Sequence, residues 1–306
     1  MLKNYIIRDN RLVENGKGDC LVAVYICPDD AEKKHLIEDL KLDEHNVNSA
    51  LDPNELSRVE FDEGHSVIIL KRPKRYSSED NFIFKISSVG LFVFPEKLIV
   101  VLTEDVPLFD AREFQKVRCI SDIVLKVIRR CITHFEQHLG VLQAISDELE
   151  EKINTSMENK SLQNMFSLEK SLVYYLKAIS SNSKVIEKVK ASAAKLSLVP
   201  EQIEYLDDLA IENSQCYEQA NTYSQVLSNM MDAWASIVSN NLNILIKKLT
   251  FITISIMVPT LVVSIFSMNV KLPMEQEHSL IPFWIISTVA ILSGAAVFGI
   301  WRFKKL

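Results

Sequence analysis

The sequence of 306 residues predicts an α/β cytoplasmic domain, followed by a long-helix stalk and two transmembrane helices. Three observations support this fold class. Nine glycines and prolines punctuate residues 1–118, where short β-rich runs alternate with helical stretches. Only Gly140 and Pro200 interrupt the chain from there to Pro259, which favours long helices. Charged side chains are then rare: residues 245–306 hold only eight of the 74 in the chain, so this part is the apolar one.

The charge balance limits the partners of the soluble part. Residues 1–240 carry 28 Lys+Arg against 38 Asp+Glu, a net charge of −10. Such acidity argues against nucleic acid and anionic lipid and favours cations. The five cysteines form no CxxC pair, which is typical of reduced cytosolic thiols rather than of a disulfide framework or a zinc ribbon. They are Cys20, Cys27, Cys119, Cys131 and Cys216.

The α/β domain is expected over residues 1–118. Alternating or continuous apolar runs predict its strands, and polar stretches between them predict its helices. The expected strands are 20–26, 66–71, 82–86, 91–94 and 98–102, and the expected helices are about 29–40 and 43–50.

A helical hairpin is expected over residues 119–198, with helices at about 121–158 and 161–196. Pro200 is placed to begin a third helix within residues 199–270. From Glu201 to Val258 there are 58 residues without Gly or Pro, about 87 Å of helix at 1.5 Å per residue. A helix of this length that runs from water into lipid needs packing partners, so the sequence predicts an oligomeric stalk.

Two spans follow from the apolar stretches 249–270 and 279–301, each long enough to cross a hydrocarbon core of about 30 Å. The membrane part of the first is expected at about 247–269, and residues 271–278 form a short extracytoplasmic loop. Lysines precede the first span and the basic tail 302–306 follows the second, so both termini are expected in the cytoplasm. The N-terminal residues do not resemble a signal peptide, and the plasma membrane is the expected location of this multi-pass protein.

A stripe of small, polar or sulfur-bearing residues follows the first span at spacings of three and four, which is one face of a helix. Its members are Asn243, Ile246, Thr250, Thr253, Met257, Thr260, Ser264 and Ser267. Such a stripe is either a helix-packing surface or the lining of a pore. Identical stripes around a symmetry axis would be both.

These residues resemble the CorA magnesium transporters, two-span metal-ion channels whose first span ends in a Gly-Met-Asn motif. The resemblance rests on Asn243, the LTFITISIMVPT run at 249–260, Ser-Met-Asn at 267–269 and the Lys-rich end after a second span. ALDPNELSRVE at 50–60 also resembles a stretch of some bacterial relatives. The resemblance covers most of the chain and implies a CorA-like homopentameric channel with the first span lining the pore.

The resemblance also implies roles for pore residues. Asn269 would form a ring of five carboxamides at the outer mouth, Met268 would support it, and Asn243 would form a second ring towards the cytoplasm. Leu249 and Met257 match apolar constrictions of the family, where dewetting stops the ion. Neutral amide oxygens suit Mg²⁺, which dehydrates reluctantly and can be held through its waters. No acidic residue lies inside either span, which argues against a proton-relay pump.

Ser267 departs from the family, which has glycine there. A positive φ at this position would cost serine about 1 kcal/mol or more, whereas a negative φ would cost little. In the loop beyond Asn269, the positive charge of Lys271 is outweighed by Glu275 and Glu277, so cations can still be attracted.

Members of the CorA family are held shut by Mg²⁺ bound between subunits. Asp208 matches the stalk carboxylate of that site and Asp207 lies beside it, although a solvated helix face is the alternative for both. The family's acidic partner positions fall on Asn48 and Ser49. The nearest replacement carboxylates are Asp52 and Glu55. The resulting hypothesis is a weakened or relocated Mg²⁺ sensor.

Other chemistry is not indicated. No P-loop, nucleophile elbow or dinucleotide fingerprint occurs, so neither an enzyme nor an organic cofactor is expected. His134 and His138 have a spacing that can bind Zn²⁺, but no third ligand follows, and a surface pair is expected.

The expected function is passive transport of a divalent cation, Mg²⁺, through a homopentameric pore. One alternative is transport of Zn²⁺, Co²⁺ or Ni²⁺ by the same kind of pore. The other is a membrane-anchored sensor or scaffold that does not conduct.

Overall fold

The structure is a computed structural model that describes residues 1–15, 20–76, 82–109, 114, 116–156, 159–268 and 280–304. Its elements are β1 (Leu2–Arg8), β2 (Arg11–Glu14), β3 (Val22–Ile26), α1 (Asp30–Lys34), the π-helix η1 (His35–Asp39), α2 (Glu44–Leu51), β4 (Arg58–Asp62), β5 (His65–Pro73), β6 (Ile86–Val93), β7 (Leu98–Leu102), α3 (Ile120–Ser156), α4 (Asn159–Ala191), α5 (Pro200–Phe266) and α6 (Ile281–Lys304). The chain divides into two compact units, Met1–Met231 and Asp232–Leu306.

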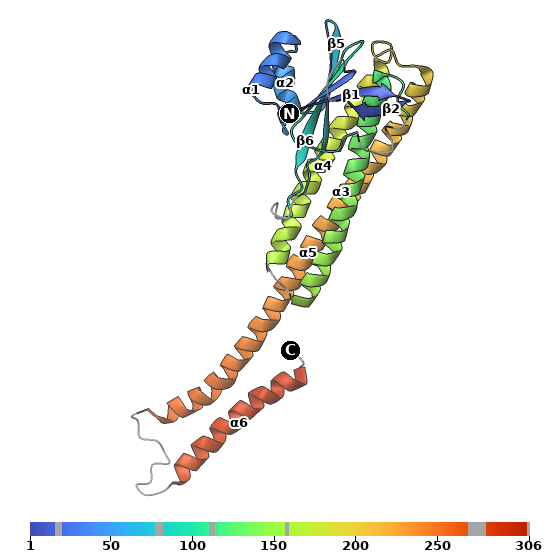
Figure 1. The fold of residues 1–306 in the computed structure, drawn as a ribbon. Coiled ribbons are helices and arrows are strands. Elements are labelled where there is room, and N and C mark those ends of the chain that lie inside the picture. The colour runs from blue at the N-terminus through green and yellow to red at the C-terminus, as the bar shows by residue number, and fades with distance from the viewer. Residues whose placement is uncertain are drawn as a thin grey trace. The chain divides into compact units, whose positions relative to one another are not determined.

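The described strands form one seven-stranded sheet in the order β2-β1-β3-β7-β6-β5-β4 (Figure 1). β3 and β7 pair in parallel, and the other neighbouring strands pair antiparallel. The runs expected at 20–26, 66–71 and 98–102 are confirmed as β3, β5 and β7.

The expectation of separate strands at 82–86 and 91–94 is wrong. Residues 82–85 are not in a strand, and β6 begins only at Ile86. It then runs on to Val93 because its small polar residues stay in the ladder, with Ser88 opposite Lys71 and Ser87 opposite Arg72. The sequence analysis also missed β1, β2 and β4. Their charged and apolar residues are mixed and largely half-exposed, so they lack the continuous apolar run of a buried strand.

The sheet is covered on both faces. α1, η1 and α2 lie against one face, where Val67 and Ile69 of β5 join Val47 and Ala50 of α2 in a buried apolar cluster. α3 and α4 contact β5 from the other side. Because strand side chains alternate between faces, β5 contributes to both layers and is buried along nearly its whole length.

Asn182 of α4 forms hydrogen bonds to the part of β5 that β4 leaves unpaired. The pairing of β4 with β5 ends at Arg58 and Ile69, so β4 does not reach the backbone of Lys71. The Asn182 amide takes its place: Oδ1 accepts from the Lys71 N–H at 2.9 Å, and Nδ2 donates to the Lys71 carbonyl at 2.8 Å. Oδ1 also accepts from Ser57 Oγ at 2.7 Å. Asn182 is only 1% exposed, so these bonds satisfy groups that water cannot reach.

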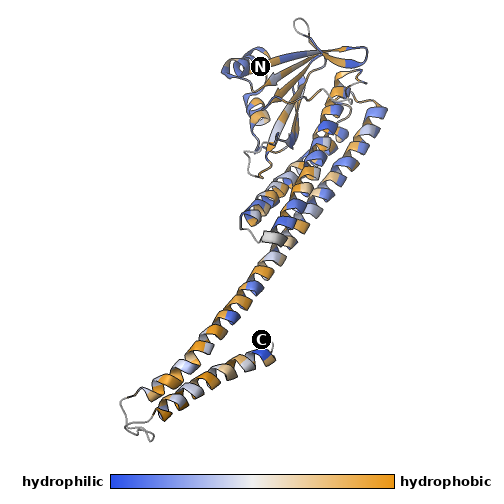
Figure 2. Ribbon diagram, turned by 60° about the horizontal axis from the view of Figure 1, so that its bottom comes forward, coloured by the Kyte–Doolittle hydropathy of each residue, from blue (hydrophilic) through white to orange (hydrophobic). Residues whose placement is uncertain are grey.

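The three long helices begin close to their expected positions, and α5 begins at Pro200. α4 ends at Ala191, five residues before its expected end, and Ser197 takes a positive φ of 52° before α5. In the second unit, apolar residues dominate α6 and the end of α5 (Figure 2). Both helices are long and apolar enough to cross a membrane.

The close approach of α2 to β6 generates a prediction. A Cβ on Gly90 would meet Ala50 Cβ at 2.4 Å, whereas a Cβ on Gly140 of α3 would meet nothing within 4 Å. We expect Gly90→Ala to lower the free energy of unfolding by about 2–3 kcal/mol through overpacking. Gly140→Ala should raise it by about 0.5–1 kcal/mol through helix propensity. Thermal unfolding of the full chain in detergent measures both, and equal effects would contradict the close packing.

Candidate functional site

The stripe of small and polar residues lies on an exposed face of α5. All eight of its members are exposed in the single chain, from Asn243 to Ser267. The apolar members are as exposed as the polar ones, with Ile246 at 51% and Met257 at 63%. Three threonines and two serines of the stripe are thus exposed in the single chain beside equally exposed apolar residues such as Ile252 and Leu261.

The opposite face of α5 packs against α6. Phe251 stacks on Trp301 of α6 with ring centroids 4.7 Å apart, and it also meets Phe298 at 6.4 Å. A Cβ on Gly294 of α6 would lie 3.2 Å from Pro259 Cγ, so this glycine lets the two helices approach closely. At about 100° per residue, the α6-facing positions lie roughly opposite the stripe. The stripe is therefore left free by the hairpin.

Backbone contacts orient the hydroxyl groups of the stripe. Thr253 Oγ1 donates to the Leu249 carbonyl at 2.9 Å, and Thr260 Oγ1 donates to the Ile256 carbonyl at 2.7 Å. Because each hydroxyl proton is donated to a backbone carbonyl of α5, the hydroxyl oxygen can still accept a hydrogen bond from a donor outside the helix. The water shell of a cation offers such donors.

The motif that ends the first span lies at the end of α5. Ser267 follows the last helical residue, Phe266, and its Oγ donates to the Ser264 carbonyl at 2.9 Å. It is not among the residues with positive φ in the part of the chain that the structure describes. The serine therefore carries no left-handed strain.

Met268, which follows Ser267, is 60% exposed. Asn269, Lys271, Glu275 and Glu277 lie outside the described residues.

The four carboxylates predicted to bind a regulatory metal have different surroundings. Asp207 forms an ion pair with Lys190 of α4, and Asp208 is exposed. Glu55 Oε1 accepts from Arg58 at 2.6 Å. No group of three or more metal-ligating side chains occurs among the described residues of the single chain.

Asn48 and Ser49, which stand where the CorA family has acidic residues, differ in exposure. Ser49 is buried, and its Oγ accepts from Arg58 at 3.0 Å, whereas Asn48 is exposed. Asp52 ends α2, where its Oδ1 accepts from the Asn54 N–H at 2.8 Å. The sequence analysis missed Arg58, whose guanidinium links Glu55 to Ser49; a lone arginine in a strand gives no signal of such a link.

His134 and His138 are not surface histidines, so that expectation is wrong. Both are half-buried on α3, with ring centroids 4.6 Å apart, because α4 and Phe84 cover this side of the helix. His138 Nδ1 lies 2.9 Å from the hydroxyl oxygen of Tyr175. Burial, with the neighbouring His138, lowers the pKa of His134 to about 3. Burial, with Arg72, lowers the pKa of His138 to about 4.

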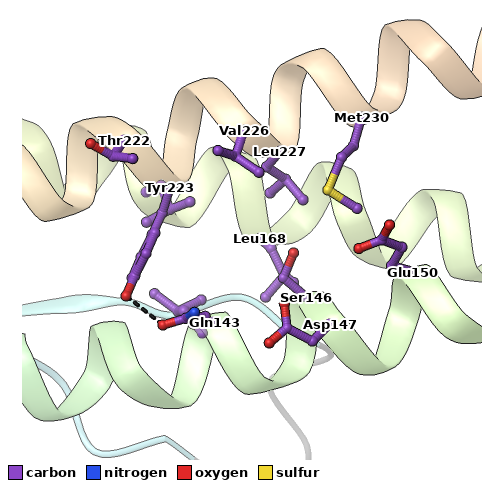
Figure 3. A pocket seen from close by; sticks show the side chains of 12 residues that line it. Gln143, Ser146, Asp147, Glu150, Leu168, Thr222, Tyr223, Val226, Leu227 and Met230 are labelled. Atoms are coloured by element: carbon purple, nitrogen blue, oxygen red, sulfur yellow. Dashed lines mark hydrogen bonds between the residues drawn. The ribbon is translucent and has the colours of Figure 1, made fainter.

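A hollow of about 190 Å³ lies among α3, α4 and α5 (Figure 3). Its wall is mostly apolar, with Leu168, Leu227 and Met230 among its residues, and Asp147 and Glu150 also line it. Tyr223 crosses it to bond with Gln143. Two carboxylates line it, and the described residues hold no group of three or more His, Cys, Asp or Glu side chains that could bind a metal ion.

An α/β domain joined to long helices and two apolar helices defines a class of two-span membrane protein. The sequence profile described as CorA-like Mg²⁺ transporter protein matches residues 25–305. The chain therefore belongs to the CorA-like Mg²⁺ transporter family, whose members transport divalent cations across membranes.

Individual relatives agree with this assignment. The chain is 24% identical over 275 residues to the cobalt/magnesium transport protein CorA of Methanocaldococcus jannaschii, covering 87% of this chain and 84% of that protein. It is 26% identical over 174 residues to the protein of the same name from Thermotoga maritima, covering 56% and 48%. The complete structure of the Methanocaldococcus jannaschii transporter has the same fold, with a TM-score of 0.79 at 22% identity over 98% of this chain and 96% of that one.

The two buried histidines predict a pH dependence. Their pKa values in the folded chain lie below the value of about 6.5 expected when unfolded, so the unfolded chain binds protons first as the pH falls. Stability should therefore be unaffected above about pH 7 and should decrease from about pH 6.5 towards pH 4, by about 1 kcal/mol per histidine at pH 5 after solvent screening.

Thermal unfolding of the full chain at pH 7 and pH 5 measures this effect. The double variant His134→Gln/His138→Gln should lose less stability between these pH values than the wild type. His45→Gln, at an exposed position on α2, is the control and should behave as the wild type. An unchanged pH dependence in the double variant would contradict the assignment.

Proposed function

We propose that this chain forms a homopentameric channel of the plasma membrane that conducts Mg²⁺ passively down its electrochemical gradient. The residues before about 247 and after 301 are cytoplasmic, and the loop 271–278 is outside. Family membership supports divalent-cation transport. The named relatives are cobalt/magnesium transport proteins, which supports Mg²⁺ and, within the alternative of Zn²⁺, Co²⁺ or Ni²⁺, supports Co²⁺.

One observation carries the proposal: the polar stripe of α5 lies opposite the face that packs on α6. In a ring of five copies, α6 lies outward and the five stripes face the axis. Thr250, Thr253, Thr260 and Ser264 then line the path with hydroxyl oxygens. Those of Thr253 and Thr260 are oriented as acceptors by their bonds to the helix backbone, which suits the water shell of a cation.

Each end of the path has a carboxamide ring in this proposal. Asn269 forms the outer ring, with Met268 and Ser267 beneath it, and Asn243 forms the inner ring. Neutral amide oxygens hold hydrated Mg²⁺ without trapping it as carboxylates would. Ile246, Leu249 and Met257 narrow the path with apolar side chains, and these are the positions where dewetting would close it.

We further propose that regulatory Mg²⁺ binds weakly at this protein's sensor, which uses Asp207, Asp208, Asp52 and Glu55. The ion pair of Asp207 with Lys190 and the bond of Glu55 to Arg58 support weak binding, because Mg²⁺ must compete with each cation.

Thr253 and Ile252 provide a test of the pore lining. In proteoliposomes, a positively charged methanethiosulfonate reagent should reduce the Mg²⁺ flux of Thr253→Cys to below about a fifth, because five bound cations would repel the ion. Ile252→Cys is its matched control at the same depth, about 100° around the helix, and should keep its flux.

The wild type serves as background, since its last cysteine is Cys216, before the span. Equal inhibition of both variants, or of neither, would contradict the proposed lining.

The outer ring is tested by Asn269→Ala. We expect Mg²⁺ flux in proteoliposomes to fall by about tenfold or more, because the amide oxygens that hold the hydrated ion are removed. Asn240→Ala, at an exposed position of α5 outside the stripe, should conduct normally. Equal flux in Asn269→Ala and wild type would refute the filter. No flux in either would favour a non-conducting sensor or scaffold, and faster flux of Zn²⁺, Co²⁺ or Ni²⁺ than of Mg²⁺ would favour the other alternative.

A further inference from the structure

A basic cavity lies in the first unit, outside the proposed ion path. It has a volume of about 320 Å³ and is bounded by the loop after α2, the adjoining ends of β5 and β6, and α4. Its lysines are Lys71, Lys74, Lys85 and Lys177. Residues 1–240 have a net charge of −10, which favours cations overall. Four lysines around one cavity are therefore a local departure from the charge of this region.

The carboxylate in the wall offsets only part of this charge. Glu55 lines the cavity, but its Oε1 accepts from Arg58 at 2.6 Å and is already paired. Among the ion pairs formed by the described residues, none includes the amine of Lys71, Lys74 or Lys177. Lys71, Lys74 and Lys177 therefore outnumber the wall carboxylate Glu55, which favours an anion.

Lys71 forms the fixed part of the cavity. It is 3% exposed, and its Nζ donates to the carbonyls of Asp52 and Pro53 at 2.9 and 3.2 Å and to Ser88 Oγ at 2.5 Å. Burial lowers the pKa of Lys71 to about 8, although the nearby carboxylates of Asp52 and Glu55 raise it, and Lys177 and Arg58 lower it further. Lys74 and Lys177 are exposed and can reach the anion directly.

One wall of the cavity is aromatic and apolar. Tyr174 is 42% exposed and Leu56 is 51% exposed, and both line the cavity beside Ala178 and Ile86. Lys170 Nζ lies 5.9 Å from the Tyr174 ring centroid, which adds a further cation near this wall. A ligand that satisfies both parts carries phosphates for the lysines and a flat group for the tyrosine.

We propose that the cavity between the α2–β4 loop and α4 binds a nucleoside polyphosphate. The phosphates lie between Lys74 and Lys177, and the base lies against Tyr174 and Leu56. A phosphorylated lipid headgroup shares the phosphate chemistry but lacks the flat base. The binding is independent of ion conduction, so its failure and the failure of the proposed pore are separable.

Isothermal titration calorimetry tests this proposal on the full chain in detergent, with EDTA present and ATP as the probe. The wild type should bind ATP, and Lys74→Ala/Lys177→Ala should weaken binding by about tenfold or more, because two charged donors are lost. Lys184→Ala, at an exposed position of α4 outside the cavity, is the matched control and should bind within about twofold of wild type. Thermal unfolding verifies that each variant is folded.

Two further probes separate the parts of the ligand. Tyr174→Ala should weaken ATP several-fold and leave pyrophosphate unchanged, because pyrophosphate has no base. Glycerol 3-phosphate, which represents a lipid headgroup, should bind more weakly than ATP. The proposal would be overturned if the wild type did not bind ATP, or if the double variant and Lys184→Ala lost equal ATP affinity. It would also be overturned if Tyr174→Ala lost ATP and pyrophosphate affinity equally, or if glycerol 3-phosphate bound more tightly than ATP.

Discussion

The amide of Asn182 is the interaction on which the arrangement of the first unit depends. A strand at a sheet edge exposes backbone groups that must be paired when they are buried. β4 is too short to pair with Lys71, and Asn182 supplies both a donor and an acceptor from α4. The same amide accepts from Ser57. Together with the bond between Ser181 and Ser57 and the bond from the Phe84 N–H to Ser171, this amide holds α4 against the sheet, and α4 forms one wall of the basic cavity.

A comparable constraint acts in the second unit. Packing of Phe251 on Trp301 and the close approach of Gly294 to Pro259 occupy one side of α5. Since lipid provides little driving force between helices, small residues and flat rings that permit close contact decide which side meets α6. The opposite side is then left uncovered by α6, and the proposed pore uses it. The polar stripe lies on this side, so the hairpin and the proposed pore impose complementary demands on one helix.

The distribution of charge is more varied than the net charge suggests. The soluble region is acidic overall, yet its lysines gather around one cavity and its two half-buried histidines stay neutral beside Arg72. Two of the carboxylates proposed for the metal sensor, Asp207 and Glu55, also form ion pairs with Lys190 and Arg58. Net charge describes the average field around a protein, whereas binding depends on which charges the fold brings together.

The sequence alone determined the order of the parts, the long helix from Pro200, the two apolar helices and the spacing of the stripe, because helical period and hydropathy are local properties. It could not determine which side of α5 packs on α6, the single strand β6, the buried histidines or the negative φ of Ser267. Those depend on contacts between segments far apart in the chain. Only the tertiary structure decides such contacts, because burial and pairing are properties of the neighbours that folding supplies.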